Sequence, residues 1–379
     1  MKEYKIKIRN IFIVFITLIL SPLLFFLLKR RKGNEKTKLR ILVIPQLTRI
    51  GDLVCSTPVF RAIKIAYPYS HLAVLVSNKV SGIIKNNTRI DEIIIYEDYL
   101  FCKLVKKIRK ENFNWGFSLS GTSISTILFL GGLIENRVKT TRENKPITEK
   151  LTNWLNNYSL EFKNHTYLPK HHLDLLKFIN ILNPEEKKEI FFSEKGNNKV
   201  KIFLKENNIS EKDKLIGISV SAGNKIKEWG DKKFLSLAET IVDKYKAKVF
   251  FVGSGKDEYR IKKLLENETK DKNYIVATNF SLEDLPSLIK NFSLFISADT
   301  GPLYIANAID VSTINIIGPV DPNEQPPKEN KNTIRVLPTK NIKPTSFVFK
   351  EGNKEKSKEA VESITVELVL DMVDKILKI

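Results

Sequence analysis

Short apolar runs alternate with segments of helical period along this chain, and this alternation constrains the fold more than any other feature. In the first half, buried strands are predicted at Leu39–Ile44, His71–Val76, Glu92–Tyr96 and Trp115–Leu119. In the second half, they are predicted at Leu215–Val220, Lys248–Val252, Tyr274–Ala277, Leu294–Ser297 and Ser312–Ile317. Strands that alternate with helices form parallel sheets built of βαβ units. The sequence therefore predicts an α/β protein of two Rossmann-like domains that face a cleft, with ligands at the carboxyl ends of the strands.

Composition narrows the class of protein. The 379 residues are enough for two domains and a membrane segment, and 42% hydrophobic with 28% charged residues fits a folded protein. The net charge of +20 favours anionic partners. Nucleic-acid binding is not expected, because lysines are spread along the chain and no recognised nucleic-acid module accompanies them. Cys55 and Cys102 stand alone without a CxxC pair, which predicts neither a disulfide framework nor a structural zinc and fits a reducing compartment.

Residues 11–28 form an uncharged apolar run of 18 residues with basic residues on both sides. A bilayer-spanning helix needs about 17–25 such residues. No small-residue cleavage site follows, so we expect an uncleaved N-terminal transmembrane anchor that contacts membrane lipids. The seven Lys/Arg from Lys29 to Arg40 place the following domains on the cytoplasmic side. A re-entrant or interfacial helix broken near Ser21-Pro22 is the alternative.

Four segments are expected along the chain. Residues 1–38 are the anchor and a basic linker, 39–190 an acceptor domain, and 191–340 a donor domain. Residues 341–379 are a tail whose helix, at about Thr365–Leu377, packs back across the domain junction. The segment from Gly121 to about Asn164 is predicted to be the least regular part, and residues 321–331 to be loop.

The stretch Phe292–Ile309 predicts a strand that turns sharply into a helix. Asp299 or Thr300 can cap this helix, and Pro302 lies in its first turn, where a missing N–H costs nothing. Such a turn directs backbone N–H groups and the positive end of the helix dipole out of the sheet edge, which favours phosphate. An ordinary capped turn is the alternative.

Two other turns are predicted at the same kind of edge. Asp52 lies at the start of a helix, where an aspartate is usually a cap, and its functional interpretation is a general base. In the loop Ser219–Trp229, small residues allow backbone N–H groups to approach phosphate, and Lys225 or Lys227 adds positive charge. A solvated lysine loop is the alternative, and Trp229 is expected to be a packing residue.

Several other site types are excluded by their missing motifs. No GxGxxG follows the first strand of either domain, and no GxxxxGK[ST] or GxSxG occurs, which counts against NAD, a P-loop and a hydrolase elbow. No Asp-x-Asp metal motif follows a strand, so no metal and no cofactor is predicted. His165, His171 and His172 are expected to have a surface or hinge role.

Four motifs occurring in order resemble one known family. They are Thr48-Arg49-Ile50-Gly51-Asp52-Leu53 with Thr57-Pro58 and Arg61-Ala62, Lys227-x-Trp229, Asp299-Thr300-Gly301-Pro302, and Gly318-Pro319-x-Asp321-Pro322. Over residues 40–335 the chain resembles the heptosyltransferases, glycosyltransferase family nine, of GT-B architecture. The resemblance implies an inverting, metal-independent transferase that takes sugar from a nucleotide-diphosphate sugar, typically ADP-heptose, to an acceptor in the cell envelope.

The resemblance also assigns residues. Asp52 matches the family's proposed base and Lys227 the lysine near the donor phosphates. The donor-binding positions that match are Ser221, Ala222, Gly223, Ser281, Leu282, Asp299, Thr300, Gly301, Leu303 and Tyr304, and those on the acceptor side are Thr48, Arg49 and Gly51. Tyr304 departs from the family, which often has His there. Tyrosine still donates a hydrogen bond but is not a cation near neutral pH, which leaves the donor sugar open.

Other functional classes remain possible at this point. Tyr304 is compatible with a membrane-tethered nucleotide-sugar binding or scaffold protein without turnover, and a UDP-sugar epimerase-like GT-B enzyme is a third reading. Asp52 together with Lys227 favours a transferase, because inversion needs a base on one side of the anomeric carbon and stabilisation of the leaving diphosphate on the other.

Overall fold

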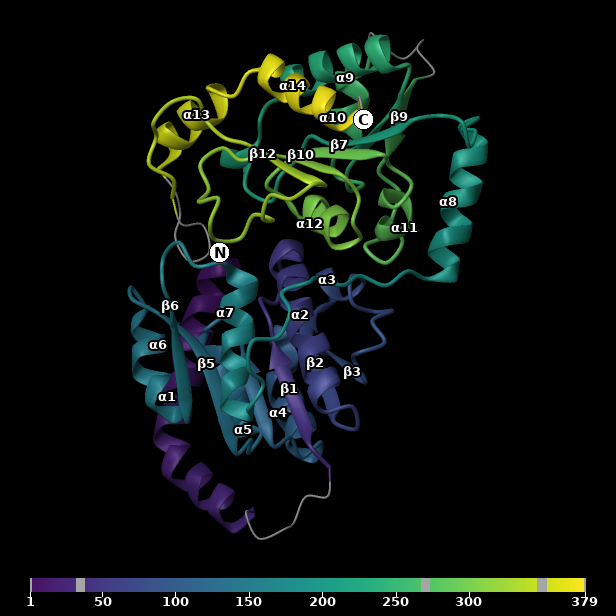
Figure 1. Ribbon diagram of the computed structural model, residues 1–379. Helices are drawn as coiled ribbons and strands as arrows, with labels where there is room; N and C mark the ends of the chain where they lie inside the picture. The colour runs from purple at the N-terminus through teal and green to yellow at the C-terminus, as the bar shows by residue number, and fades with distance from the viewer. Residues whose placement is uncertain (1, 32–37, 267–272, 346–352, 378–379) are drawn as a thin grey trace. The chain divides into compact units, whose positions relative to one another are not determined.

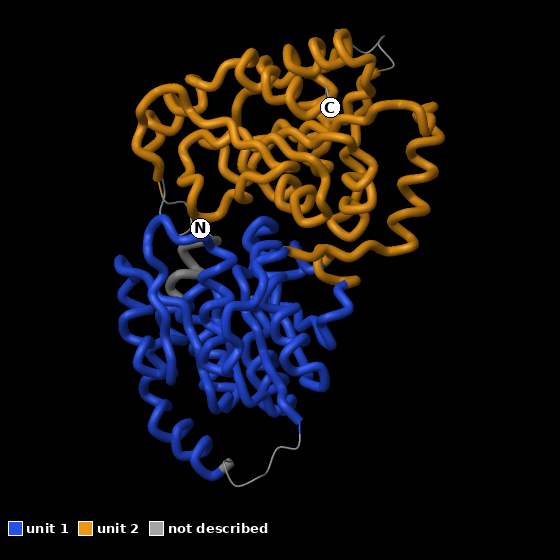
Figure 2. Tube along the Cα trace, viewed as in Figure 1, with its two compact units in different colours: residues 1–81, 87–187 blue, residues 82–86, 188–379 orange. Residues whose placement is uncertain are grey.

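The computed structural model describes residues 2–31, 38–266, 273–345 and 353–377. The chain divides into two compact units, residues 1–81 with 87–187 (unit 1) and residues 82–86 with 188–379 (unit 2), coloured separately in Figure 2. Each unit contains one six-stranded parallel sheet with helices packed on it (Figure 1). This confirms the predicted α/β class with two Rossmann-like domains. The domain boundaries that the sequence suggested stay predictions.

Unit 1 contains the sheet of order β3-β2-β1-β4-β5-β6. Its strands are β1 (Arg40–Ile44), β2 (His71–Ser77), β3 (Glu92–Tyr96), β4 (Trp115–Ser118), β5 (Asn136–Arg142) and β6 (Tyr158–Phe162). Its helices are α1 (Lys2–Arg31), α2 (Ile50–Ala66), α3 (Asn78–Ser81), α4 (Phe101–Lys110), α5 (Ser123–Gly131), α6 (Ile147–Thr152) and α7 (Leu168–Asp174), with 3-10 turns η1 (Asp98–Leu100), η2 (Asn153–Leu155) and η3 (Leu175–Ile179). The strands are buried because side chains of β1 and β2 pack against α4 and α5 in one core, for example Leu42 and Leu75 with Ile108 and Phe129.

The segment from Gly121 to Asn164 is more regular than the sequence suggested, which corrects that expectation. It forms α5, β5, α6 and β6 and completes the sheet. The strand β5 reads as polar, NRVKTTR, yet Arg137 and Lys139 in it are buried. Arg137 is satisfied because it donates to the carbonyl oxygens of Ile134, Glu135 and Leu155. Lys139 Nζ meets no hydrogen-bond partner among the described residues. A hydropathy pattern does not identify a strand that buries such charges.

The helix α1 belongs to unit 1 and packs on α5 and α6 (Figure 1). Its segment Arg9–Arg30 contains an 18-residue stretch with a mean hydropathy of 3.0 and is long and apolar enough to cross a membrane, judged by length and composition alone. The helix continues through Pro22 without a break.

His171 and His172 are buried in α7, which corrects the surface part of the expected surface or hinge role, whereas His165 is exposed. His172 hydrogen-bonds the backbone of Cys55 on α2 and Leu119 after β4, while its Nδ1 meets no partner among the described residues. The donor is therefore Nε2, and the ring ties α2 to the end of β4. Burial lowers the pKa of His171 to about 4 and that of His172 to about 3.

Acidification is expected to destabilise unit 1 through these two histidines. The unfolded chain takes up protons as the pH falls through about 6.5, but the folded unit stays neutral at both rings until about pH 4 and pH 3. The free energy of unfolding is unaffected above that window and falls inside it by up to about 1.4 kcal/mol per pH unit for each histidine. Urea unfolding of the full chain at several pH values measures this slope. His172→Gln keeps an N–H donor near the Nε2 position without titrating, so it should make the slope shallower, and an unchanged slope would contradict the assignment.

Unit 2 contains the sheet of order β12-β11-β10-β7-β8-β9. Its strands are β7 (Leu215–Ser219), β8 (Lys248–Val252), β9 (Tyr274–Ala277), β10 (Leu294–Ala298), β11 (Thr313–Ile316) and β12 (Thr333–Val336). Its helices are α8 (Glu194–Glu206), α9 (Asp231–Tyr245), α10 (Glu258–Leu264), α11 (Leu285–Ile289), α12 (Gly301–Ala308), α13 (Lys354–Glu362) and α14 (Val366–Leu377), with a 3-10 turn η4 (Lys225–Lys227). The sequence reading did not predict α8, β12 or α13.

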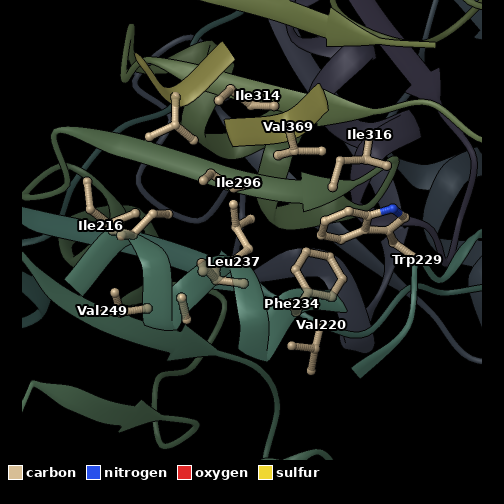
Figure 3. Packing of buried hydrophobic residues seen from close by; sticks show 14 of the residues in the cluster. Ile216, Val220, Trp229, Phe234, Leu237, Val249, Ile296, Ile314, Ile316 and Val369 are labelled. Carbon is tan, nitrogen blue, oxygen red and sulfur yellow. The ribbon is translucent and has the colours of Figure 1, made fainter. Parts of the chain in front are cut away.

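The core of unit 2 lies between its sheet and the helices α9 and α14 (Figure 3). Phe234 and Leu237 of α9 and Val369 of α14 pack on Ile216, Ile296 and Ile314 of the strands. Trp229 is a packing residue, as predicted: its ring meets Phe234 edge to face and its Nε1 donates to the carbonyl oxygen of Ile364 at 2.8 Å. The apolar stripe of α14 is thus occupied inside unit 2, and packing across a domain junction stays a prediction.

Candidate active site

The predicted donor turns lie at the topological switch point of unit 2. Strands β7 and β10 are neighbours, with Ser219 opposite Ser297. After β7 the chain goes on to β8 on one side of this pair, and after β10 it goes on to β11 on the other side. The loop after β7 and the turn after β10 therefore leave the same edge side by side. In open parallel sheets this is where ligands bind.

One ion pair joins the two turns. Lys227 Nζ lies 2.6 Å from Asp299 Oδ2, and the hydroxyl of Tyr304 donates to Asp299 Oδ1. The side chain of Asp299 is 4% exposed and that of Lys227 is 15% exposed. The structure thus brings together three of the predicted residues. Tyr304, the position that departs from the family pattern, is buried and holds the carboxylate that pairs with the lysine.

The helix α12 begins at this pair. Its N-cap residue Thr300 has an extended backbone, and its side chain makes no capping hydrogen bond. Gly301 and Pro302 form the first turn and are half-buried, while Leu303 is buried in the unit. A helix N-terminus whose backbone N–H groups lack a side-chain cap, next to a lysine, is suited to bind an anion such as a diphosphate.

The β7 loop is held in place by residues that sequence reasoning missed. Glu228 Oε1 accepts from the backbone N–H of Ala222 at 3.3 Å, and Glu228 Oε2 pairs with Arg260 at 2.8 Å. Arg260 also pairs with Asp231 at 2.6 Å, and the two acids raise the pKa of the guanidinium further above its usual range. Arg260 is on α10, 32 positions after Glu228, so no local sequence pattern reveals this ion pair.

Gly223 lies in this loop and has open space around it. A Cβ added to it would meet nothing within 4 Å, and its φ is not positive. The fold itself therefore does not require glycine, whereas close approach of the loop backbone to a phosphate would.

Gly223→Ala is expected to keep or slightly raise stability, by about 0.4–1 kcal/mol, and to weaken nucleotide-diphosphate binding about tenfold or more. Gly255→Ala is a matched control, because a Cβ there also meets nothing within 4 Å. Titration calorimetry with ADP on both variants measures the effect. Equal affinity in the two variants would remove Gly223 from the donor site.

Ser281 and Leu282 lie apart from the Lys227–Asp299 ion pair. They follow β9, which is separated from β10 by β7 and β8. Ser281 Oγ donates to Asp284 Oδ2 at 2.8 Å and accepts from the backbone N–H of Asp284, so it caps the chain entering α11. With strands about 4.8 Å apart, its distance from the Asp299 turn suits a long ligand such as a nucleotide rather than a single phosphate.

In unit 1 the corresponding switch point lies between β1 and β4, where Ile44 is opposite Ser118. Asp52 is in the first turn of α2 and is half-buried, Gly51 is buried, and Thr48 and Arg49 are exposed. The N-cap residue Arg49 makes no side-chain capping hydrogen bond.

The other side of this switch point was not predicted from sequence. The chain after β4 is fixed by Leu119, whose N–H donates to the carbonyl oxygen of Ile44 at 2.9 Å, and by His172. Gly121 has φ +69, and a Cβ there would lie 2.6 Å from the carbonyl oxygen of Thr140, so only glycine fits. The single signal in the sequence was a glycine just after a predicted strand.

Among the described residues, one group could offer three ligand atoms to a metal: His71, Glu92 and Glu111. These residues lie at the amino ends of strands or before them, away from the switch point. Glu92 pairs with Lys107 at 2.7 Å and Glu111 pairs with Arg40, so their charges are already compensated. We interpret the group as an ion-pair network.

Comparison with known proteins places the chain in a family. Residues 101–356, more than half of the chain, match the family described as Glycosyltransferase family 9 (heptosyltransferase). The chain belongs to glycosyltransferase family 9. It is therefore a glycosyltransferase, and the resemblance carried by the four motifs is confirmed.

Individual relatives of this family 9 member agree along most of its length. Lipopolysaccharide heptosyltransferase 1 of Campylobacter coli is 25% identical over 325 residues, which are 81% of this chain and 93% of that protein. Among solved structures, the glycosyl transferase family 9 from Veillonella parvula is similar with a TM-score of 0.76 at 18% identity, covering 91% and 99% of the two chains. E. coli ADP-heptose LPS heptosyltransferase II has a TM-score of 0.72 at 18% identity, covering 90% and 99%. These structures confirm the GT-B fold of this family 9 chain.

Proposed function

We propose that this family 9 glycosyltransferase transfers heptose, with inversion, from ADP-heptose to a glycan or lipid-linked acceptor of the cell envelope. The observation that carries the proposal is the Lys227–Asp299 pair at the start of α12, on the switch point of the unit 2 sheet. The names of the Campylobacter coli and E. coli relatives support heptose as the sugar and ADP as the nucleotide.

On the donor side, Lys227 and the backbone amides at Thr300 and Gly301 bind the diphosphate, with Ser221, Ala222 and Gly223 approaching it from the β7 loop. The lysine is held by Asp299, whose second oxygen is occupied by Tyr304. A positive charge fixed before the reaction stabilises negative charge as it develops on the leaving ADP. Ser281 and Leu282 take the nucleoside end.

On the acceptor side, Asp52 acts as general base, with Thr48, Arg49 and Gly51 beside it. It accepts the proton of an acceptor hydroxyl while that oxygen forms a bond to the anomeric carbon. The bond between the anomeric carbon and the diphosphate oxygen breaks on the opposite face, and ADP leaves with the electron pair. This sequence of bond changes inverts the configuration.

The test is acceptor-dependent transfer by the full chain. A panel of ADP-, GDP- and UDP-sugars is first ranked by thermal shift, because a ligand of the native state raises the free energy of unfolding by RT ln(1 + [L]/Kd). We expect ADP-heptose to give the largest shift and to be consumed only when a heptose-accepting glycolipid is present. A larger shift with a UDP-sugar, or binding without transfer to any acceptor, would overturn the assignment of donor or of turnover.

A further inference from the structure

The helix α1 has two faces of different character, and one of them is part of unit 1. Val14, Thr17, Ser21 and Leu28 are buried, and Leu28 packs in a cluster with Leu130, Leu133 and Leu155 of the domain. The spacing of these positions along α1 places them on one side of the helix. This face of α1 closes a satellite core over α5.

The ring contacts of Phe25 also join α1 to unit 1. The Phe25 ring lies 6.0 Å from that of Trp154, and the guanidinium of Arg137 lies over it at 5.6 Å. Withdrawing α1 from unit 1 would break these contacts and expose the leucine cluster to water.

The opposite face of α1 is apolar and exposed. Eight large side chains on it are between 38% and 62% exposed: Ile11, Phe12, Phe15, Ile16, Ile19, Leu20, Leu23 and Phe26. They recur at helical spacing, so they form one continuous stripe, and no charged residue occurs among residues 11–28. An exposed apolar stripe of this length marks a surface that meets a partner.

The domain continues this stripe next to α1. Ile147 and Leu151 of α6 and Trp154 of η2 are exposed, and α6 packs against α1. Lys150 on α6 and Lys29 and Arg30 at the end of α1 are exposed as well, with Arg30 over the Phe26 ring at 5.6 Å. Aromatic and aliphatic side chains bordered by cations match the interfacial region of a bilayer with anionic headgroups.

We propose that α1 lies flat in the surface of an anionic lipid bilayer while it stays docked on unit 1, and that Trp154 enters the interface with it. A helix that spans the bilayer is surrounded by hydrocarbon, so a docked α1 would carry the exposed Lys150 and the ends of α6 into it. An undocked α1 would span alone but lose the contacts of Phe25 and Leu28. In the plane of the bilayer surface, the docked face of α1 keeps its contacts with unit 1 and the exposed apolar face contacts lipid. This favours an interfacial helix over the spanning anchor, although the helix is not broken near Ser21-Pro22 as the interfacial alternative expected. This inference goes beyond the proposed function and does not depend on the donor.

The experiment uses the full chain and vesicles of phosphatidylcholine with or without phosphatidylglycerol. Flotation measures binding, and quenching by brominated lipid measures which tryptophan enters the bilayer. Of the three tryptophans, Trp229 is buried and Trp115 half-buried, so Trp154 is the exposed one, and Trp154→Phe identifies its signal. The test variant is Phe15→Glu with Ile19→Glu. The matched control is Ile202→Glu, at an isoleucine on α8 that is 59% exposed.

We expect stronger binding to the vesicles that contain phosphatidylglycerol, with quenching that Trp154→Phe abolishes. The α1 double variant should bind at least about 100-fold more weakly than the parent, because each substitution removes apolar contact with lipid and adds a negative charge. Ile202→Glu should bind as the parent does. Binding without quenching of Trp154 would show that α1 inserts alone and would overturn docking in the plane. Absence of binding, or binding that the double variant leaves unchanged, would overturn the lipid surface itself.

Discussion

Replacing Asp52 with asparagine is expected to lower the rate of sugar transfer by about 10²–10⁴-fold, the usual contribution of a general base. The substitution keeps the size of the side chain and removes its ability to accept a proton. Asp52 is half-buried in the first turn of α2, where a carboxylate interacts favourably with the helix dipole by about 0.3–1 kcal/mol. Loss of stability should therefore stay within about 1 kcal/mol. Steady-state transfer from ADP-heptose at saturating donor measures the rate.

Two controls make this result specific. Asp174→Asn changes another helical aspartate of unit 1, one whose side chain is 41% exposed and pairs with Lys170 four residues before it, so transfer should be unchanged. Binding of ADP to Asp52→Asn should also match the parent, because the proposed diphosphate contacts all lie in unit 2. Full transfer by Asp52→Asn would remove Asp52 as the base, and weakened ADP binding would assign it to the donor instead.

Replacing Lys227 with alanine is expected to have two separate effects. Nucleotide-diphosphate binding should weaken by about 10²-fold or more, because a charge-assisted contact to phosphate contributes about 1.5–3 kcal/mol and its loss also leaves Asp299 facing the anion. Unit 2 should lose about 3–5 kcal/mol of stability, because the buried Asp299 carboxylate loses its cation and retains the hydrogen bond from Tyr304. Calorimetric titration with ADP and urea unfolding measure the two effects.

A double variant separates these effects. Lys227→Ala with Asp299→Asn removes both charges, so most of the lost stability should return, while ADP binding should stay weak. Lys227→Arg keeps the charge and should retain part of both. If the double variant recovers ADP binding together with stability, Lys227 is a structural ion-pair partner and does not contact the diphosphate.

The sequence was most informative about the central strands of the two sheets. The apolar runs that became β1, β7 and β10 were located almost to the residue, because buried central strands of parallel sheets are continuously apolar. The edge strands β6 and β12 were missed, since they carry mixed, partly exposed residues, whereas the edge strands β3 and β9 were found because each has an apolar run at its centre. The polar β5 was missed for a different reason, because the partners of its buried Arg137 are backbone carbonyl groups that only the folded domain supplies.

The residues of the candidate site also fall into some that the sequence could select and others that it could not. Thr48–Asp52, Ser219–Trp229 and Asp299–Leu303 could be selected from sequence, because each follows a predicted strand and begins a helix or a glycine-containing loop. Their roles as base and donor contacts stay predictions. The residues that hold these turns in place, Glu228 with Arg260 and His172, carry no local pattern.

By itself the sequence determined the class of fold, the two sheets and the identity of the turns, because these depend on the period of apolar residues and on helix-start chemistry over a few positions. Only the tertiary structure decided which turns meet: Lys227 and Asp299 are 72 positions apart and become partners because β7 and β10 are neighbours in the sheet. It also decided the character of α1. Residues 11–28 of α1 are uncharged and apolar all round in sequence, and only packing on α5 and α6 distinguishes the buried face from the exposed face.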